Sequence, residues 1–146
     1  MTTIKWNAPN AHEHIFTTEL NSIANGAGQI SSALSNNAAG ELDMYLNADL
    51  YLSTQTARSA GATVSLYILP AVDGNYSYGS ASLLPPAQNL AGVWCFDAAV
   101  TARHSVISGI LLPPCDFYIV VWNNTGQAFA ATLNTMTIER YSVQSA

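Results

Sequence analysis

Charged side chains are scarce in this chain. Of its 146 residues only 9% are Asp, Glu, Lys or Arg, whereas 49% are hydrophobic. Ordinary soluble domains carry about 25% charged residues. Because buried charges must be paired, a surface with few charges can be covered by another surface at low desolvation cost, and weak charge repulsion favours association. The composition therefore predicts a subunit of an assembly.

Basic residues and long apolar segments are also lacking. The four basic residues, Lys5, Arg58, Arg103 and Arg140, are scattered, and the formal net charge is −5. Nucleic-acid binding needs clustered cations that displace counterions, so we expect no nucleic-acid partner. No apolar run approaches the ~20 residues of a membrane-spanning helix, and we expect no membrane association.

The chain contains only two cysteines, Cys95 and Cys115, without the spacing of a metal site. The first residues, MTTIKWNAPN, include one Lys but no apolar segment, so no secretory signal is expected. This predicts folding in the cytoplasm, with the thiols reduced and buried as small hydrophobic groups. A disulfide is the alternative, because both cysteines flank predicted strands that can be neighbours.

Alternation of apolar and polar residues is the strongest signal present. From Leu42 to Ser53 every second residue is apolar, which is the period of a strand and not of a helix. One face should join a core and the other should meet solvent or a partner. The predicted inner positions are Leu42, Met44, Leu46, Ala48, Leu50 and Leu52, and the outer ones include Tyr45 and Tyr51.

Other short segments have the same character. Phe117 to Trp122 lies between Pro113-Pro114 and an Asn123-Asn124-Thr125-Gly126 turn signal, and a return strand follows up to Tyr141 and a short polar tail, 143–146. Further strands are predicted within 14–20, 29–34, 63–69, 93–96 and 103–109, and residues 70–76 should end the third of these.

About eight strands without a convincing helix predict an all-β fold. The natural solution is a two-sheet antiparallel β-sandwich, jelly-roll-like in its strand order. Residues 14–146 should form this single domain, and residues 1–13 an extended N-terminal arm.

One constellation has the spacing of a metal motif. His12-Glu13-His14, followed by Glu19 and Gly26, resembles the first half of the cupin motif. The match fails because Trp6 stands where that motif has Gly, because no histidine follows Pro113-Pro114, and because His12 lies too near the N-terminus. We therefore expect no bound metal.

Signatures of catalysis are missing as well. No G-x-S-x-G, Walker loop or C-x-x-C occurs, and His104 has no recognisable nucleophile in motif context. Asp43 and Asp49 share one strand face but lie roughly 20 Å apart, too far for paired glycosidase carboxylates. We expect neither an enzyme nor a cofactor.

Two places are candidates for partner binding. The first is the arm, with Ile4, Lys5 and Trp6, which either straps onto a neighbour or forms a simple edge strand. The second is the polar strand face with Tyr45 and Tyr51. Tyr offers a flat apolar ring and a hydroxyl, so this face suits cross-strand pairing, a protein interface or a carbohydrate platform.

Three segments together resemble small virion proteins of tailed bacteriophages. They are the strand 63–70 running into Val72-Asp73-Gly74-Asn75-Tyr76, residues 110–121, and residues 123–141. Cys115 departs from the Gly that is usual after two prolines in such a turn. The resemblance is to jelly-roll head decoration, or cement, proteins.

That resemblance implies a structural protein on the capsid exterior, made in the host cytoplasm. Its partner would be the major capsid protein, whose neighbouring subunits it would clamp as a dimer or trimer. A receptor- or glycan-binding jelly roll of a tail fibre is the alternative, and a cupin-like metal-binding protein is the third possibility.

Overall fold

Strands make up nearly all of the regular structure in the computed structural model, which describes residues 3–37 and 42–145. One short 3-10 helix, η1 (Ala87–Asn89), interrupts them. The strands are β1 (Ile4–Trp6), β2 (Glu13–Phe16), β3 (Gly28–Ile30), β4 (Tyr45–Leu52), β5 (Thr63–Val72), β6 (Asn75–Tyr76), β7 (Leu90–Cys95), β8 (Arg103–Leu111), β9 (Phe117–Asn124), β10 (Thr135–Tyr141) and β11 (Val143–Ser145).

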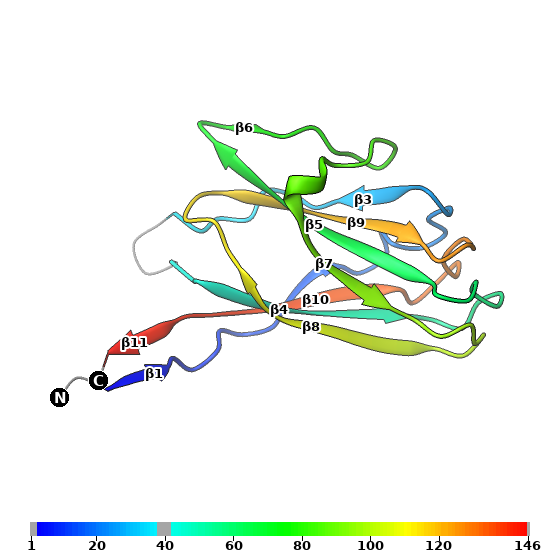
Figure 1. The fold of residues 1–146 in the computed structure, drawn as a ribbon, viewed down its shortest axis with the longest axis horizontal. Coiled ribbons are helices and arrows are strands. Elements are labelled where there is room, and N and C mark those ends of the chain that lie inside the picture. The colour runs from blue at the N-terminus through cyan, green and yellow to red at the C-terminus, as the bar shows by residue number, and fades with distance from the viewer. Residues whose placement is uncertain (1–2, 38–41, 146) are drawn as a thin grey trace.

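Two antiparallel sheets face each other, as Figure 1 shows. One sheet has the order β2-β10-β4-β8. The other runs β3-β9-β5, with β7 and β6 both pairing β5. When β1, β6 and β11 are left out and the other eight strands are renumbered 1 to 8 in chain order, the two sheets have the strand orders 1-8-3-6 and 2-7-4-5. This is the strand order of a jelly roll, so the predicted all-β, two-sheet antiparallel sandwich is confirmed.

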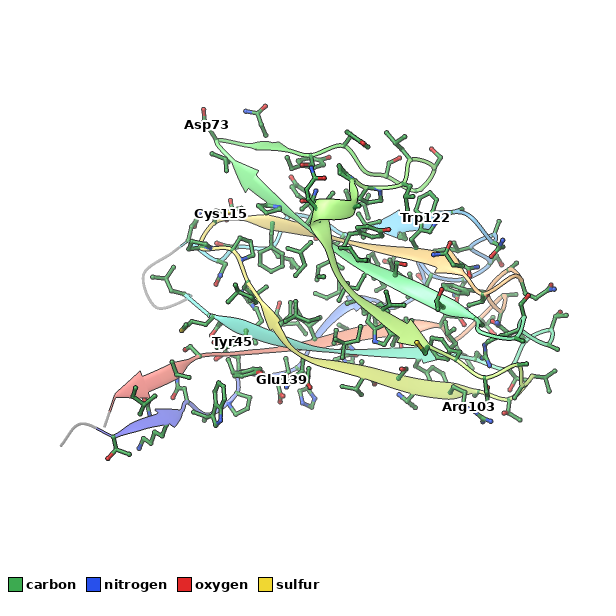
Figure 2. All side chains as sticks on the ribbon, in the orientation of Figure 1. Tyr45, Asp73, Arg103, Cys115, Trp122 and Glu139 are labelled. Carbon is green, nitrogen blue, oxygen red and sulfur yellow. The ribbon has the colours of Figure 1, made fainter. Side chains whose placement is uncertain are left out.

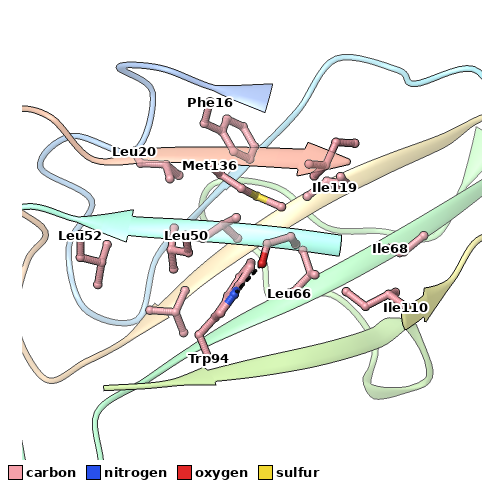
Figure 3. Close-up of a cluster of buried hydrophobic side chains, with 14 of the residues drawn as sticks. Phe16, Leu20, Leu50, Leu52, Leu66, Ile68, Trp94, Ile110, Ile119 and Met136 are labelled. Atoms are coloured by element: carbon pink, nitrogen blue, oxygen red, sulfur yellow. Dashed lines mark hydrogen bonds between the residues drawn. The ribbon is translucent and has the colours of Figure 1, made fainter. Parts of the chain in front are cut away.

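The core lies between the sheets, and β4 shows why. Leu46, Ala48, Leu50 and Leu52 are completely buried, whereas the residues that alternate with them are partly exposed. Figure 3 shows Leu50 and Leu52 packed with side chains from both sheets, and the Trp94 indole N–H donating to the Ala48 carbonyl over 3.3 Å. The predicted alternation is therefore confirmed over the length of the strand.

The alternation does not extend to Leu42 and Met44, which precede β4 and were expected on its inner face. Leu42 is 58% exposed and Met44 is 41% exposed, so neither belongs to the core. The Asn36 side chain binds this segment instead: its amide N–H donates to the Asp43 carbonyl, and its Oδ1 accepts the Asp43 N–H. The strand begins only at Tyr45.

The predicted end of β5, at residue 69, was wrong. β5 continues through Pro70 to Val72, and Asp73 and Gly74 then form the turn into β6. Proline is tolerated there because the N–H on the β9 side belongs to Ala71, which donates to the Asp116 carbonyl. The Pro70 nitrogen faces the other edge of β5, where pairing with β7 reaches only Tyr67, so no ladder bond is lost.

Two further segments differ from the prediction. β2 ends at Phe16, because the N–H groups of Thr17 and Thr18 donate to the Glu19 carboxylate and not to a neighbouring strand. These bonds lower the pKa of Glu19. The expected polar tail is a strand as far as Ser145, β11, because it finds a partner in β1.

The cysteines are not core residues. Cys95 is exposed at the end of β7, Cys115 is partly exposed in the turn before β9, and both are free thiols. The prediction of buried hydrophobic cysteines was wrong, because Cys95 occupies an outward position between the core residues Trp94 and Phe96, and Cys115 lies in the turn between β8 and β9. The alternative, a disulfide between them, is not formed.

The outer surfaces of the two sheets differ. The chain after β6 folds back over the β3-β9-β5 sheet (Figure 1), where Tyr76 packs on Tyr118 at 4.2 Å between ring centroids. Beneath it, Leu69 and Trp122 are buried in a second, smaller apolar cluster. The outer face of the β2-β10-β4-β8 sheet has no such cover among the described residues, and we call it the open face.

Candidate functional site

The open face is built from four rows of outward side chains that cross the sheet. Strand register puts Tyr141, Tyr45 and Leu111 in the first row and Thr135, Tyr51 and His104 in the last. The two middle rows are polar. They bring together residues that lie more than 100 positions apart in the chain, such as His12 and Glu139.

The second row is a chain of hydrogen bonds centred on Asn47. Its amide donates to Glu139 Oε2 over 3.2 Å, and its Oδ1 accepts the Gly109 N–H over 3.2 Å. The other oxygen of Glu139 lies 3.2 Å from His12 Nε2. Both the nitrogen and the oxygen of the Asn47 side-chain amide are therefore hydrogen-bonded, which fixes the orientation of the amide.

The third row contains Thr137 and Asp49, paired across β10 and β4. His14 Nδ1 lies 3.0 Å from the Thr137 hydroxyl, and Asp49 accepts from His104 Nδ1 over 2.9 Å. All three histidines of the chain thus lie on the open face. The middle rows line a shallow depression of about 350 Å³, which we call the polar depression.

Aromatic rings lie in the row next to the polar depression. Trp6 meets Tyr45 and Tyr141 edge-on, at 5.8 and 5.5 Å between ring centroids, and the two tyrosines stack at 5.6 Å. We call these three residues the aromatic cluster. Figure 2 shows Tyr45 and Glu139 on the side of the molecule that carries the open face. In the row on the other side of the depression, Tyr51 packs on His104 at 4.6 Å.

The N-terminal arm runs along the chain's own C-terminus. Ile4 and Trp6 pair with Ser145 and Val143, and this two-stranded ribbon of β1 and β11 extends beyond the sandwich in Figure 1. Asn7 and Asn10 continue the contact by donating to the carbonyls of residues 142 and 140. Ile4 is 75% exposed and Trp6 63% exposed.

The five predicted partner-binding residues therefore fall in two places. Ile4, Lys5 and Trp6 lie on the ribbon, and Trp6 reaches Tyr45. Tyr51 lies apart from them, in the row with His104. Their role in binding stays a prediction. Sequence reasoning missed Tyr141, Asn47 and Glu139, although all three occupy outward positions of alternating strands.

The residues with cupin-like spacing do not converge. His12 and His14 both line the polar depression, but Glu13 bonds Arg140 over 2.7 Å and Glu19 is held by its own turn. Within residues 3–37 and 42–145, no three His, Cys, Asp or Glu side chains are grouped as metal ligands.

Charge is gathered at the opposite end of the sandwich, around Asp97. Arg103 donates to Asp97 over 2.7 and 3.0 Å, and this pairing lowers the pKa of the Asp97 carboxyl. Arg58 is 3% exposed, and burial lowers its pKa. It donates to the Ala99 carbonyl and lies 5.3 Å from the Phe96 ring centroid. These contacts hold the loop after β7 against the sandwich, which is a structural role.

A larger depression, of about 540 Å³, lies beside β8. It is lined by apolar side chains such as Ile68, Leu90 and Leu112, and by the Pro113-Pro114 turn. No titratable side chain contributes to it, so it offers no acid, base or nucleophile.

Comparisons with known proteins add little. No family profile and no curated protein matches the chain. Among solved structures, it is similar to the enzymatically active domain of tailspike protein 4 of bacteriophage CBA120, with 11% identity and a TM-score of 0.35. The alignment covers 98% of this chain and 18% of that one. A likeness of this size carries no argument about fold or function.

No helix among the described residues is long and apolar enough to cross a membrane.

Proposed function

We propose that this protein is a capsid decoration protein of a tailed bacteriophage. In this role it binds the outside of the head and stabilises contacts between major capsid subunits. It acts by adding buried area across subunit boundaries, and it performs no chemistry.

The ribbon is the observation that carries the proposal. Each strand of a two-stranded ribbon has one edge with unpaired N–H and carbonyl groups, which can pair with a strand of another protein. On the ribbon, most of the apolar surface of Ile4 is exposed, and Trp6 stays 63% exposed although it contacts Tyr45 and Tyr141. Lys5 supplies a positive charge that takes part in no salt bridge among residues 3–37 and 42–145.

The position of the ribbon also suits a strap. Isolated two-stranded ribbons are marginally stable in water. Here the aromatic cluster joins the ribbon to β4 and β10, and edge-to-face aromatic pairs contribute about 0.5–1.5 kcal/mol each beyond their burial. These contacts therefore fix the direction of the ribbon, while the outer edges of β1 and β11 have no partner strand among the described residues.

The low charge of the chain and the resemblance of its segments support the same role. The resembling segments form the β5–β6 hairpin, β9 and β10, which build the jelly-roll framework. An interface of about 1,600 Å² at each site is of ordinary size, but many copies on one head add up to a large stabilisation.

The test uses phage heads assembled without this protein, to which the purified full chain is added. We expect Ile4→Ser to weaken head binding about tenfold or more, because a buried Ile contributes about 1.5–3 kcal/mol. Val72→Ser is the matched control, since Val72 is 70% exposed at the opposite hairpin. Binding would be followed by cosedimentation and by occupancy in electron micrographs. Absence of binding by the unmodified protein, or equal binding of both variants, would contradict the proposal.

A further inference from the structure

We propose that the polar depression of the open face is a binding site for a neutral saccharide. This inference concerns a different surface from the exposed edges of the ribbon, and it stands independently of capsid decoration.

The groups in the depression are hydrogen-bond partners for hydroxyls. Asp49 and Glu139 present carboxylate oxygens on neighbouring strands, in adjacent rows. Diagonal neighbours on a sheet lie about 7–8 Å apart at their backbones, a spacing that one sugar ring can bridge with two hydroxyls. Hydrogen bonds to ionised acceptors are stronger than those between neutral groups, so each carboxylate is a good acceptor for an O–H.

The lining argues against anionic, metallic and apolar ligands. It contains two carboxylates and neither Lys nor Arg, which disfavours phosphate, sulfate and acidic sugars. The described residues include no three-ligand metal group. The only apolar side chains in the lining are Val106 and Ile138, and Ile138 is 1% exposed, so an apolar ligand would leave the polar groups unpaired. A neutral ligand with several hydroxyls meets all three conditions.

Aromatic side chains lie in the rows next to the depression on both sides, although they are not part of its lining. Tyr45 and Tyr141 lie in one of these rows, and Tyr51 with His104 in the other. Sugar rings have an apolar face of C–H groups that packs on a flat aromatic ring, while the hydroxyls at the ring edge reach polar groups. The volume of about 350 Å³ is near the lower end of ligand sites, which suits one or two sugar units.

The site is already organised before a ligand arrives. Glu139 is held by His12 and Asn47, and Asp49 by His104. The Asn47 amide is itself tied to the Gly109 N–H. Because these side chains lie on paired strands and are already hydrogen-bonded, little conformational freedom is lost on binding.

The experiment probes the full-length protein on an array of immobilised oligosaccharides, neutral and acidic, followed by calorimetric titration with the free form of any that bind. We expect at least one neutral oligosaccharide to bind. Glu139→Gln and Asp49→Asn keep the side-chain shape and should each weaken binding about tenfold or more. Asp73→Asn is the matched control, because Asp73 is exposed in the β5–β6 turn, and it should change the affinity less than twofold.

Thermal unfolding and head binding serve as additional readouts for the two depression variants. We expect both properties to match those of the unmodified protein, so that failure of the saccharide site is distinguishable from failure of the decoration role. Failure of every neutral oligosaccharide to bind, binding of acidic ones alone, or an affinity that neither Glu139→Gln nor Asp49→Asn lowers would overturn the inference.

Discussion

At the scale of single residues, Asn123 shows how a turn signal in the sequence becomes a structural centre. It is completely buried at the end of β9. Its amide donates to the carbonyls of Ile23 and Gln127 over 2.9 and 2.8 Å, and its Oδ1 accepts from both the N–H and the hydroxyl of Thr125. These four bonds join two loops to the strand and use the full bonding capacity of the side chain.

Substitution of this residue should be costly. Asn123→Ala removes all four bonds. The carbonyls of Ile23 and Gln127 each keep one other donor, but the buried Thr125 N–H loses its acceptor, and we expect the free energy of unfolding to fall by about 3 kcal/mol. Asn124→Ala is the control, because Asn124 is exposed and makes one long bond, of 3.3 Å, to Ser65; its effect should stay within about 1 kcal/mol. Denaturant titration measures both. Equal losses would show that the bonds of Asn123 do not determine its contribution.

At the scale of elements, β4 illustrates what periodicity can and cannot predict. The alternating pattern correctly separates Leu46, Leu50 and Leu52 from the outward Tyr45 and Tyr51. It does not reveal where the strand begins, because that depends on the Asn36 side chain bonding Asp43 from another part of the chain. The same reasoning misplaced the end of β5, where tolerance of Pro70 depends on how far β7 extends.

A matched pair of substitutions tests this boundary. Leu50→Ala should lower the free energy of unfolding by about 2–5 kcal/mol, since it opens a cavity in the closed core. Leu42→Ala is the same chemical change at a position of the same sequence pattern, but Leu42 is 58% exposed and should lose no more than about 0.5 kcal/mol. Thermal and denaturant unfolding would compare them. A large loss for Leu42→Ala would place the start of the strand earlier than Tyr45.

At the scale of the whole molecule, one core should unfold as one unit. The main apolar cluster takes residues from both sheets, and its first member along the chain is Phe16. The ribbon supplies none of its residues, within the part of the chain that the structure describes. The ribbon and the sandwich are joined instead by the aromatic cluster and by backbone bonds from Asn7 and Asn10.

Removal of residues 1–9 should therefore leave the sandwich intact. We expect a single cooperative unfolding transition with a nearly unchanged denaturant slope, because the slope follows the surface exposed on unfolding. The free energy of unfolding should fall by about 1–2 kcal/mol, the contribution of the lost aromatic contacts, and the denaturant midpoint should fall in proportion. Fluorescence and circular dichroism should report the same transition. Two separate transitions, or a clearly smaller slope, would show that the arm belongs to the core.

The sequence by itself was sufficient for the all-β class, the two-sheet arrangement and the inward positions of β4. Alternation of side chains across a strand is a local property, so it is visible in any stretch of a few residues. The Asn-Gly and Asp-Gly turn signals are local in the same way, because they report which residues tolerate a positive φ. The scarcity of charged residues was also readable directly from composition.

Only the tertiary structure decided which strands are neighbours and what their outer surfaces bring together. Ile4 pairs with Ser145, and His12 meets Glu139, across almost the full length of the chain. No local pattern encodes such pairings, because they depend on how all the apolar faces are buried at once and on which sheet edge remains free. For that reason the residue types of the arm and the open face could be recognised in advance, whereas the ribbon and the polar depression appear only in the folded molecule.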